Sequence, residues 1–193
     1  AVDLAQHIDT ASKPIHVVPL GLNPMNTVTN TRPPWAPKSP FLFSLGNFLQ
    51  HKNFHTLIAM MRHLPNYKLI VAGKKETPYG EKVIREREEL GLANQILLPG
   101  VISDSDRHWL YENCDAFVFP SLTEGFGFPV LEAMQFGKPV ATSNRTSLPE
   151  IAGNRGFYFT SYEANHMART VQEAIRKFRE NPNAARQSRD HAN

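Results

Sequence analysis

Apolar residues gather along most of this chain into short uninterrupted runs, which are separated by longer segments whose apolar positions recur every three or four residues. An uninterrupted run is typical of a strand buried on both faces, whereas the longer spacing is typical of an amphipathic helix. The runs predict strands at Phe41–Leu45, Tyr67–Ala72, Ile96–Leu98, Ala116–Phe119, Pro139–Thr142 and Gly156–Phe159. The longer segments predict helices at Phe54–Leu64, Thr77–Leu90, Asp106–Asn113, Pro129–Phe136 and Glu163–Glu180.

The regular alternation of these strands and helices predicts the α/β class. With right-handed crossovers it gives a Rossmann-like, doubly wound parallel sheet with helices on both faces. Ligands of such sheets bind beyond the carboxyl ends of the strands. The loops at Gly46 and Gly100 and the turn from Glu124 to Glu132 all follow predicted strands. We therefore expect these loops to converge at one edge of the sheet.

The first 40 residues lack this alternation. Ile15–Gly21 predicts a short strand and turn, and residues 23–40 hold five prolines, which is typical of an extended connector. We divide the chain into a lead-in and interdomain connector over residues 1–40, a Rossmann-like domain over 41–180 and a C-terminal tail over 181–193.

Composition narrows the function classes. With 193 residues, of which 41% are hydrophobic and 20% charged, the chain fits a globular protein with one substantial core. A net charge of +3 is too small to indicate a nucleic-acid partner. The sequence has no apolar run of the roughly 20 residues that a membrane helix needs. Cys114 is the only cysteine, which excludes a disulfide within the chain and favours a cytoplasmic setting.

The most informative segment runs from Ser121 to Glu132. It places the carboxylates of Glu124 and Glu132 on either side of a glycine-rich turn, between a predicted buried strand and a predicted helix. Carboxylates can accept hydrogen bonds from the vicinal hydroxyls of a sugar or a ribose. The backbone amides at the start of the helix should point outward and favour an anion such as a diphosphate. These amides belong to Gly125, Phe126, Gly127 and Phe128.

A second loop supplies a cation. Lys52 follows the predicted strand Phe41–Leu45 and directly precedes a predicted helix, where an ammonium can reach phosphate oxygens. A lysine in such a place is most often only solvated. We consider this lysine a phosphate-binding candidate because the anion site expected in the Ser121–Glu132 segment needs a cation nearby.

Several motifs together resemble the C-terminal domain of glycosyltransferase family 4, over about Ile15 to about Lys177. The motifs are Gly46-x5-Lys52, Pro99-Gly100-Val101, Pro120-Ser121-x2-Glu124-Gly125-Phe126-Gly127-x-Pro129-x2-Glu132, Gly137-Lys138-Pro139-Val140 and Leu148-Pro149-Glu150-Ile151. Members of this family are retaining, metal-independent enzymes of the GT-B fold. The segments His51–His55 and Cys114–Phe117 are similar to bacterial mannosyltransferases that build surface polysaccharide.

The resemblance implies a role for each matching residue. Glu124 would face the hydroxyls of the donor sugar, the amides of residues 125–128 would hold the distal phosphate, and Glu132 would bind the ribose. Lys52 would neutralise the charge that grows on the departing diphosphate. Glu124 and Lys52 are therefore the expected catalytic residues. The remaining donor-binding positions are Gly46 and Asn47 in the first loop, and Val101 and Ile102, which would contact the base largely through backbone groups.

Asn47 is a departure from the family pattern, because many members carry arginine directly after the glycine of this loop. Asparagine can still donate a hydrogen bond, but it removes a charge. Stabilisation of the leaving group then rests more heavily on Lys52, or on a cation from elsewhere in the chain.

For the intact enzyme the resemblance implies transfer of a hexose, with mannose favoured, from a GDP-sugar or UDP-sugar, without a cofactor or metal. The acceptor would be a glycan or a lipid-linked glycan at the inner face of the cytoplasmic membrane, and it would bind an N-terminal domain. We expect that domain to end just before or within Ala1–Thr10, and the last helix of the family fold to lie beyond Asn193. The 193 residues alone should bind a sugar nucleotide weakly and transfer nothing.

Other functions are open. A sugar-nucleotide epimerase of the same fold would use water rather than a glycan, and a non-catalytic sugar-nucleotide-binding module would not need Glu124. A dinucleotide-dependent oxidoreductase is less favoured, because Val130 stands at the third glycine-type position after Gly125 and Gly127.

Some residues favour structural interpretations. Ser103 or Asp104 should cap the helix after Gly100, which is a simpler explanation of Asp104-Ser105-Asp106 than a metal site. His51, His55 and His63 lack carboxylate partners at ligand spacing and favour a solvated face. Trp109 and Tyr111 should pack in the core, and Cys114 should behave as a small buried apolar residue.

Overall fold

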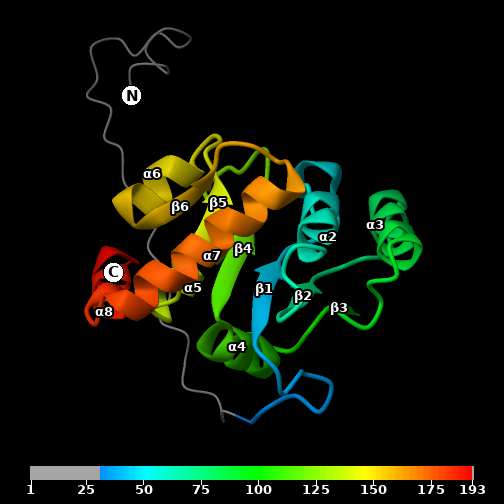
Figure 1. Ribbon diagram of the computed structural model, residues 1–193, viewed down its shortest axis with the longest axis horizontal. Helices are drawn as coiled ribbons and strands as arrows, with labels where there is room; N and C mark the ends of the chain where they lie inside the picture. The colour runs from blue at the N-terminus through cyan, green and yellow to red at the C-terminus, as the bar shows by residue number, and fades with distance from the viewer. Residues whose placement is uncertain (1–30, 193) are drawn as a thin grey trace, which may run out of the picture.

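The computed structural model describes residues 31–192 and contains a six-stranded sheet between two layers of helices (Figure 1). The strands are β1 (Phe41–Leu45), β2 (Lys68–Ala72), β3 (Ile96–Gly100), β4 (Ala116–Phe119), β5 (Val140–Ser143) and β6 (Gly156–Phe159). The helices are α2 (His55–Met61), α3 (Pro78–Glu89), α4 (Asp104–Asn113), α5 (Phe128–Gln135), α6 (Leu148–Ala152), α7 (Ala164–Glu180) and α8 (Ala184–Ala192). Two 3-10 turns, η1 (Gln50–Lys52) and η2 (Gly153–Arg155), complete the assignment.

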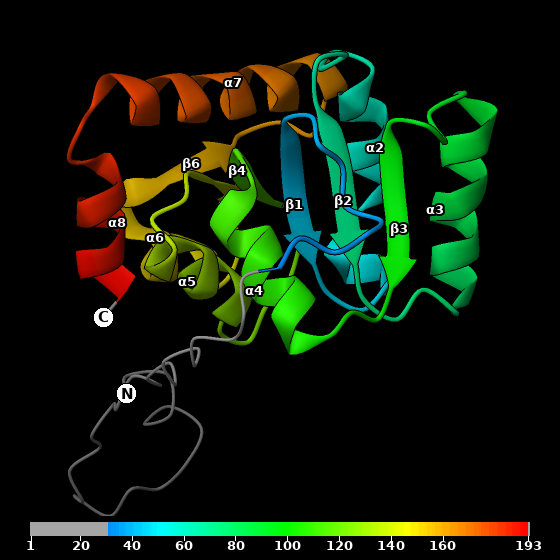
Figure 2. The same ribbon diagram turned by 90° about the horizontal axis from the view of Figure 1, so that it is seen from below.

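All neighbouring strands run parallel, in the order β3-β2-β1-β4-β5-β6. In Figure 2 the arrows of β1, β2 and β3 point the same way. The chain moves outward from β1 to β3 and then returns to the other side of β1, where Leu42 pairs with Ala116 of β4. The direction of winding therefore reverses between β1 and β4. The doubly wound, Rossmann-like sheet predicted from the sequence is confirmed.

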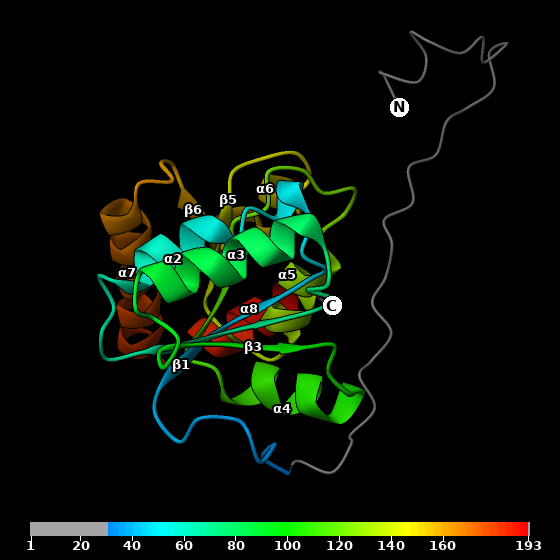
Figure 3. The same cartoon turned by 90° about the vertical axis from the view of Figure 1, so that its right-hand side faces the viewer.

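Each face of the sheet packs against its own layer of helices. Side chains of α2, α3 and α7 pack on one face, and those of α4, α5 and α6 on the other. Figure 3 shows α2 and α3 on one side of β1 and β3, and α4 on the other side. Along β4, Ala116 and Val118 belong to the first cluster, whereas Phe117 and Phe119 belong to the second. Because successive side chains of a strand point to opposite faces, a strand buried on both faces must be apolar throughout. This requirement produces the uninterrupted runs of the sequence.

The predicted strands Phe41–Leu45, Ala116–Phe119 and Gly156–Phe159 are confirmed with the same bounds, and the other strands differ by one or two residues at an end. The predicted helices are also present, and the largest difference is the earlier end of α2. The sequence did not predict α6 or α8. The segment Ile15–Gly21 and the lead-in Ala1–Thr10 lie outside the described residues.

The last helix, α8, packs against the end of α5. Gly137 follows α5 with a positive φ of 67°. A Cβ atom there would lie only 2.4 Å from Nη1 of Arg189 and 3.0 Å from Cβ of Ala185. His191 also places its Nε2 atom 2.8 Å from the carbonyl oxygen of Ile151 in α6. The C-terminal helix is thus attached to the two helices that follow β4 and β5.

Candidate functional site

The site begins at the reversal of strand order. Gly46 follows β1, and the segment that starts at Pro120 follows β4, so the loops after these two neighbouring strands leave the sheet side by side. A reversal point of this kind is where ligands bind in open parallel sheets. A short contact joins the two loops, because the amide of Leu122 donates to the carbonyl of His51 at 2.7 Å.

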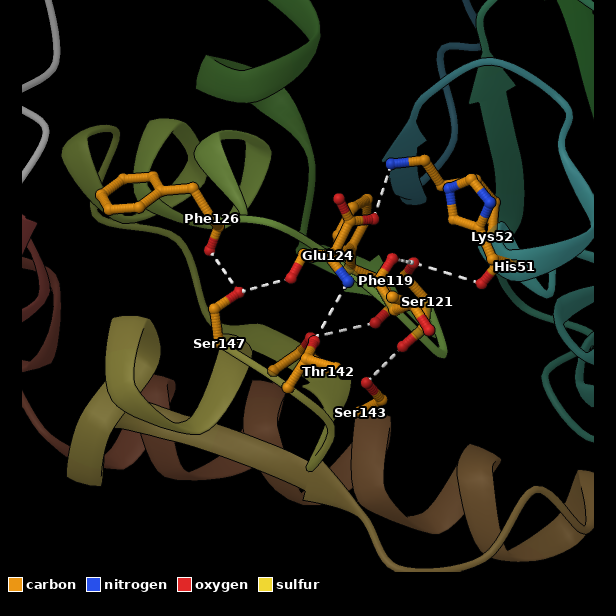
Figure 4. Close-up of polar contacts among 11 residues, drawn as sticks. His51, Lys52, Phe119, Ser121, Glu124, Phe126, Thr142, Ser143 and Ser147 are labelled. Atoms are coloured by element: carbon orange, nitrogen blue, oxygen red, sulfur yellow. Dashed lines mark hydrogen bonds and ion pairs between the residues drawn. The ribbon is translucent and has the colours of Figure 1, made fainter. Parts of the chain in front are cut away.

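Lys52 and Glu124 form an ion pair across the two loops. The Nζ atom of Lys52 lies 2.6 Å from Oε1 of Glu124, and the two side chains are 13% and 12% exposed. The same ammonium lies 4.9 Å from the centre of the Phe119 ring, within the range of a cation–π contact. Figure 4 shows Lys52 reaching across to Glu124, with the Phe126 ring on the far side of the turn. The two expected catalytic residues are therefore in direct contact.

Glycines let the neighbouring loops approach closely. A Cβ atom at Gly46 would lie 3.2 Å from Cε of Lys52. A Cβ atom at Gly73, whose φ is 139°, would lie 2.0 Å from the carbonyl oxygen of Gly46. Since real Cβ atoms do not approach other atoms so closely, a larger residue at Gly73 would push the loops after β1 and β2 apart.

The turn after Glu124 is held from the α6 side. The amide of Glu124 donates to Oγ1 of Thr146 at 3.0 Å. The hydroxyl of Ser147 donates to the carbonyl of Phe126 at 2.8 Å and lies 3.2 Å from that of Glu124. Gly127 caps α5 with a φ of 104°. Thr146 and Ser147 were not among the predicted site residues, and the only hint in the sequence is the polar run before Pro149.

The start of α5 leaves backbone donors free. Within residues 31–192, no acceptor is paired with the amides of residues 125–128. Gly125 and Phe128 are exposed, Phe126 is half-buried, and Gly127 is buried. A free amide at a helix N-terminus attracts anions, because the helix dipole adds to the local donor. The free donors that the sequence predicts are therefore present, and a phosphate group as their ligand stays a prediction.

Glu132 stands one helical turn into α5, and the core holds it from behind. The hydroxyl of Tyr111 donates to Oε2 of Glu132 at 2.7 Å. Burial, and next the neighbouring charge of Glu132, raise the pKa of Tyr111 well above its usual value. The phenol therefore stays protonated and remains a donor. Tyr111 packs in the core as predicted, but its contact with Glu132 was not foreseen.

A groove of about 350 Å³ lies beside this glutamate. Its lining includes six of the predicted donor-binding residues, namely Gly46, Asn47, Val101, Ile102, Phe128 and Glu132. Lys52 and Glu124 are not among its lining residues, but Gly46 lines the groove and also contacts Lys52. The ion pair and the groove are thus neighbouring parts of one edge.

The side chain of Asn47 has a structural contact in the first loop. Its Oδ1 atom accepts from the amide of Lys74 at 3.2 Å, so it holds the loop after β2. The groove is also lined by Arg107, from the first turn of α4, whose guanidinium pairs with Asp104 at 3.1 Å. Arg107 is a cation that sequence reasoning missed, and its only signal is its place shortly after the Gly100 loop.

The structural interpretations of the remaining polar residues can now be compared with their surroundings. Ser103 caps α4 through the amide of Asp106 at 3.0 Å. In the described part of the chain, no group of three or more histidine, cysteine, aspartate or glutamate residues is arranged to hold a metal ion. His55 does not face solvent as expected, because its Nδ1 atom lies 2.9 Å from the hydroxyl of Tyr79 on α3. Burial lowers the pKa of His55. Trp109 and Cys114 are buried as predicted.

No helix in the part of the chain that the structure covers has the length and apolar character needed to cross a membrane.

A doubly wound parallel sheet with a groove at its reversal point defines this chain as a Rossmann-like ligand-binding domain. The family model "Glycosyl transferases group 1" matches residues 29–191. The chain therefore belongs to this family.

Curated relatives show which members of this family the chain is similar to. The serotype-specific mannosyltransferase WbdA of Escherichia coli is 36% identical over 141 residues, which are 70% of this chain and 17% of that protein. The O-antigen chain mannosyltransferase B of Escherichia coli is 37% identical over 118 residues, which are 58% of this chain and 30% of that protein. The chain thus spans less than a third of the length of these relatives. The resemblance to bacterial mannosyltransferases predicted from the sequence is confirmed.

Solved structures show the same fold. The structure of Anabaena HepE in complex with UDP and glucose has a TM-score of 0.72 and 24% identity, and the match covers 80% of this chain and 43% of HepE. The TarM structure from S. aureus has a TM-score of 0.74 and 16% identity, and the match covers 98% of this chain and 38% of TarM. These matches agree with the GT-B half that the resemblance implied.

Proposed function

We propose that this chain is the donor-binding half of a retaining mannosyltransferase that uses a GDP-sugar or UDP-sugar. One observation carries the proposal. The Lys52–Glu124 pair and the carboxylate of Glu132 stand on either side of the free amides that begin α5, at the reversal of strand order. This arrangement offers acceptors for hydroxyls at both ends and donors for phosphate between them.

The donor would lie along this edge with its base in the groove. Glu132 would accept hydrogen bonds from the ribose, and the backbone near Val101 and Ile102 would contact the base. The amides of residues 125–128 would bind the distal phosphate. Glu124 would then face the hydroxyls of the sugar. The transferred sugar would be a hexose, with mannose favoured because the relatives are named mannosyltransferases.

Lys52 would stabilise the leaving group. Breaking the bond between sugar and diphosphate adds negative charge to the departing oxygen, and a nearby ammonium lowers the energy of that charge. Without ligand, Lys52 is paired with Glu124. Binding must therefore loosen the pair, since sugar hydroxyls would occupy Glu124 while phosphate oxygens attract Lys52. The lysine and the backbone amides can together take the electrostatic role that a metal ion fills in other phosphate sites.

The acceptor would be a growing glycan, lipid-linked at the inner membrane face and bound by an N-terminal domain outside the described residues. The relatives support a glycan acceptor, since three are named for the O-antigen chain.

Titration calorimetry tests the donor site. The chain would be titrated without metal against GDP, UDP and their mannose and glucose conjugates, with Glu132→Ala as the comparison. We expect one nucleotide to bind and the substitution to weaken it by about tenfold, the loss of a charged hydrogen bond to the ribose. Binding of neither nucleotide would contradict the proposal. The intact enzyme with labelled donor then separates the activities: oligosaccharide indicates a transferase, whereas free isomerised sugar indicates an epimerase.

A further inference from the structure

Tyr111 combines complete burial with a polar contact at the edge of the groove. It has no exposed surface. Its ring stacks on Phe136 with centroids 5.6 Å apart, and it meets Phe43 edge-on at 5.0 Å and Phe117 at 5.4 Å. Aromatic neighbours on several sides leave the ring little freedom to move. The hydroxyl is therefore held at a fixed point behind α5.

That hydroxyl has one proton and two acceptors within reach. It lies 2.7 Å from Oε2 of Glu132 and 3.3 Å from the carbonyl oxygen of Pro129. A charged acceptor at the shorter distance makes the stronger bond. The proton therefore points to Glu132, and the fixed ring fixes one oxygen of that carboxylate.

The other carboxylate oxygen has no hydrogen-bond partner among residues 31–192, and Glu132 lines the groove. One oxygen of the glutamate is thus bound to the core, and the other is left open on a residue that lines the groove. A carboxylate with two oxygens of unequal availability has a preferred orientation before any ligand arrives.

Packing alone does not require this hydroxyl. A phenylalanine would fill nearly the same space, and a buried hydroxyl costs free energy unless it is hydrogen-bonded. The only side-chain acceptor it meets in the described part of the chain is Glu132, the residue that faces the groove. The oxygen atom of Tyr111 is therefore best explained by what it does to Glu132.

We propose that Tyr111 is a positioning residue, which turns the carboxylate of Glu132 so that its open oxygen accepts hydrogen bonds from the vicinal hydroxyls of a ribose. This inference rests on the proposed function, because it assumes that a nucleoside diphosphate occupies the groove. It adds that the preference for ribose over a sugar without these hydroxyls depends on a residue that never touches the ligand.

The test compares ribose with its dideoxy form in wild type and Tyr111→Phe. Calorimetry would measure the affinities for GDP and UDP and for their 2′,3′-dideoxy analogues. In wild type we expect the ribose form to bind at least about tenfold more tightly, as a charged acceptor for two hydroxyls allows. In Tyr111→Phe the ratio should fall about threefold or more, through weaker binding of the ribose form, with the dideoxy affinity unchanged. A merely structural role would weaken both forms equally.

Two further variants complete the design. Tyr158→Phe is the matched control, since it deletes a phenol oxygen that bonds the Gly153 carbonyl elsewhere, and it should leave the ratio unchanged. If Tyr111→Phe does not fold, 4-aminophenylalanine at position 111 keeps the ring and places a weaker donor at the same point beside Glu132. It should lower the ratio in part, and an unchanged ratio would contradict the role of Tyr111.

The outcomes separate the two proposals. A wild-type chain that binds a nucleotide but does not prefer ribose, or a Tyr111→Phe variant that keeps the full ratio, overturns the role of Tyr111 and leaves the donor site intact. A wild-type chain that binds no nucleoside diphosphate overturns the proposed function, and the role of Tyr111 fails with it.

Discussion

The two glutamates that flank the start of α5 are held in opposite ways. Glu124 lies in a loop and is neutralised by the ammonium of Lys52 from a second loop. Glu132 lies within a helix and receives a proton donor from Tyr111, a neutral residue of the core. The first contact crosses between two loops, whereas the second joins a helix to the packed aromatic cluster behind it.

Because they are held differently, Glu124 and Glu132, at the two ends of the site, should respond differently to a bound donor. An ion pair at a partly exposed site can be exchanged for contacts with a ligand, because both partners find new partners of similar strength. A hydrogen bond from a neutral donor leaves the carboxylate charged and in need of further donors. We infer that the Glu124 end rearranges when a donor binds, and that the Glu132 end is already set.

The largest effect should come from removing the cation at the Glu124 end. Lys52→Ala in the intact enzyme should lower kcat by about 100- to 1,000-fold, because the departing diphosphate loses its nearest positive charge. Steady-state kinetics would measure it. Lys68→Ala is the control. That lysine stands at the start of β2, away from the proposed site, and donates to the carbonyl of Asn94. Equal effects of the two substitutions would refute the role of Lys52.

A larger residue at Gly73 should push apart the loops after β1 and β2 and so lower the stability of the fold. Gly73→Ala forces a Cβ atom against the Gly46 carbonyl at a φ of 139°, and we expect it to cost about 2–4 kcal/mol of unfolding free energy. Gly91→Ala is matched, because its φ of 68° is also positive but no atom lies within 4 Å. It should cost only about 1 kcal/mol. Urea unfolding would compare them, and similar costs would show that the close approach does not matter.

The two ends should respond with opposite signs to loss of charge. Glu124→Gln frees Lys52, so a nucleoside diphosphate without a sugar should bind about three- to tenfold more tightly. Glu132→Gln removes the acceptor for the ribose and should weaken the same ligand. Calorimetry with GDP and UDP would measure both. Weaker binding in both variants would mean that the Lys52–Glu124 pair does not compete with the diphosphate.

The smallest expected effect is on the pH dependence of stability and concerns Tyr111, the neutral donor to Glu132. The raised pKa of Tyr111 means that the unfolded chain loses this proton near pH 10 while the folded chain keeps it. The unfolded state then binds fewer protons, so stability is complete below pH 10 and falls as the pH rises. At pH 10.5 this costs about 0.8 kcal/mol for one tyrosine. Tyr111→Phe should lose less stability than wild type between pH 8 and 10.5.

Unfolding curves at the two pH values would measure that difference. Tyr79, whose pKa burial raises to about 12, remains in both proteins and contributes equally. An equal loss in wild type and Tyr111→Phe would mean that the phenol is not kept neutral by the fold.

The fold followed from the sequence because its signals are local. The run Ala116–Phe119 is apolar at every position, and only a strand buried on both faces requires that. The helix α3 was predicted over Thr77–Leu90, ending before Gly91, and the structure adds that the side chain of Thr77 caps it. Helix α6 has five residues, one of them proline, and α8 has few apolar side chains, so neither carries a periodic pattern.

The site was predictable only as far as single loops reveal it. The Glu124–Glu132 turn carries its own signature of glycines, proline and carboxylates. The contact between Lys52 and Glu124 joins residues 72 positions apart, and that between Tyr111 and Glu132 joins residues 21 apart. Such contacts depend on which strands become neighbours and on how the helices pack over them. A tyrosine in an apolar helix face therefore indicates packing until the fold shows what its oxygen meets.

The packing of α8 on α5 sets a limit on how this domain can be shortened. A chain that ended at Glu180 would retain every residue proposed to touch the donor. It would nevertheless uncover Gly137 and the end of the helix whose other end faces the phosphate, since Arg189 and Ala185 would be gone. The shortest form of this domain that keeps its packing is therefore longer than the part proposed to touch the ligand. It extends through Ala192.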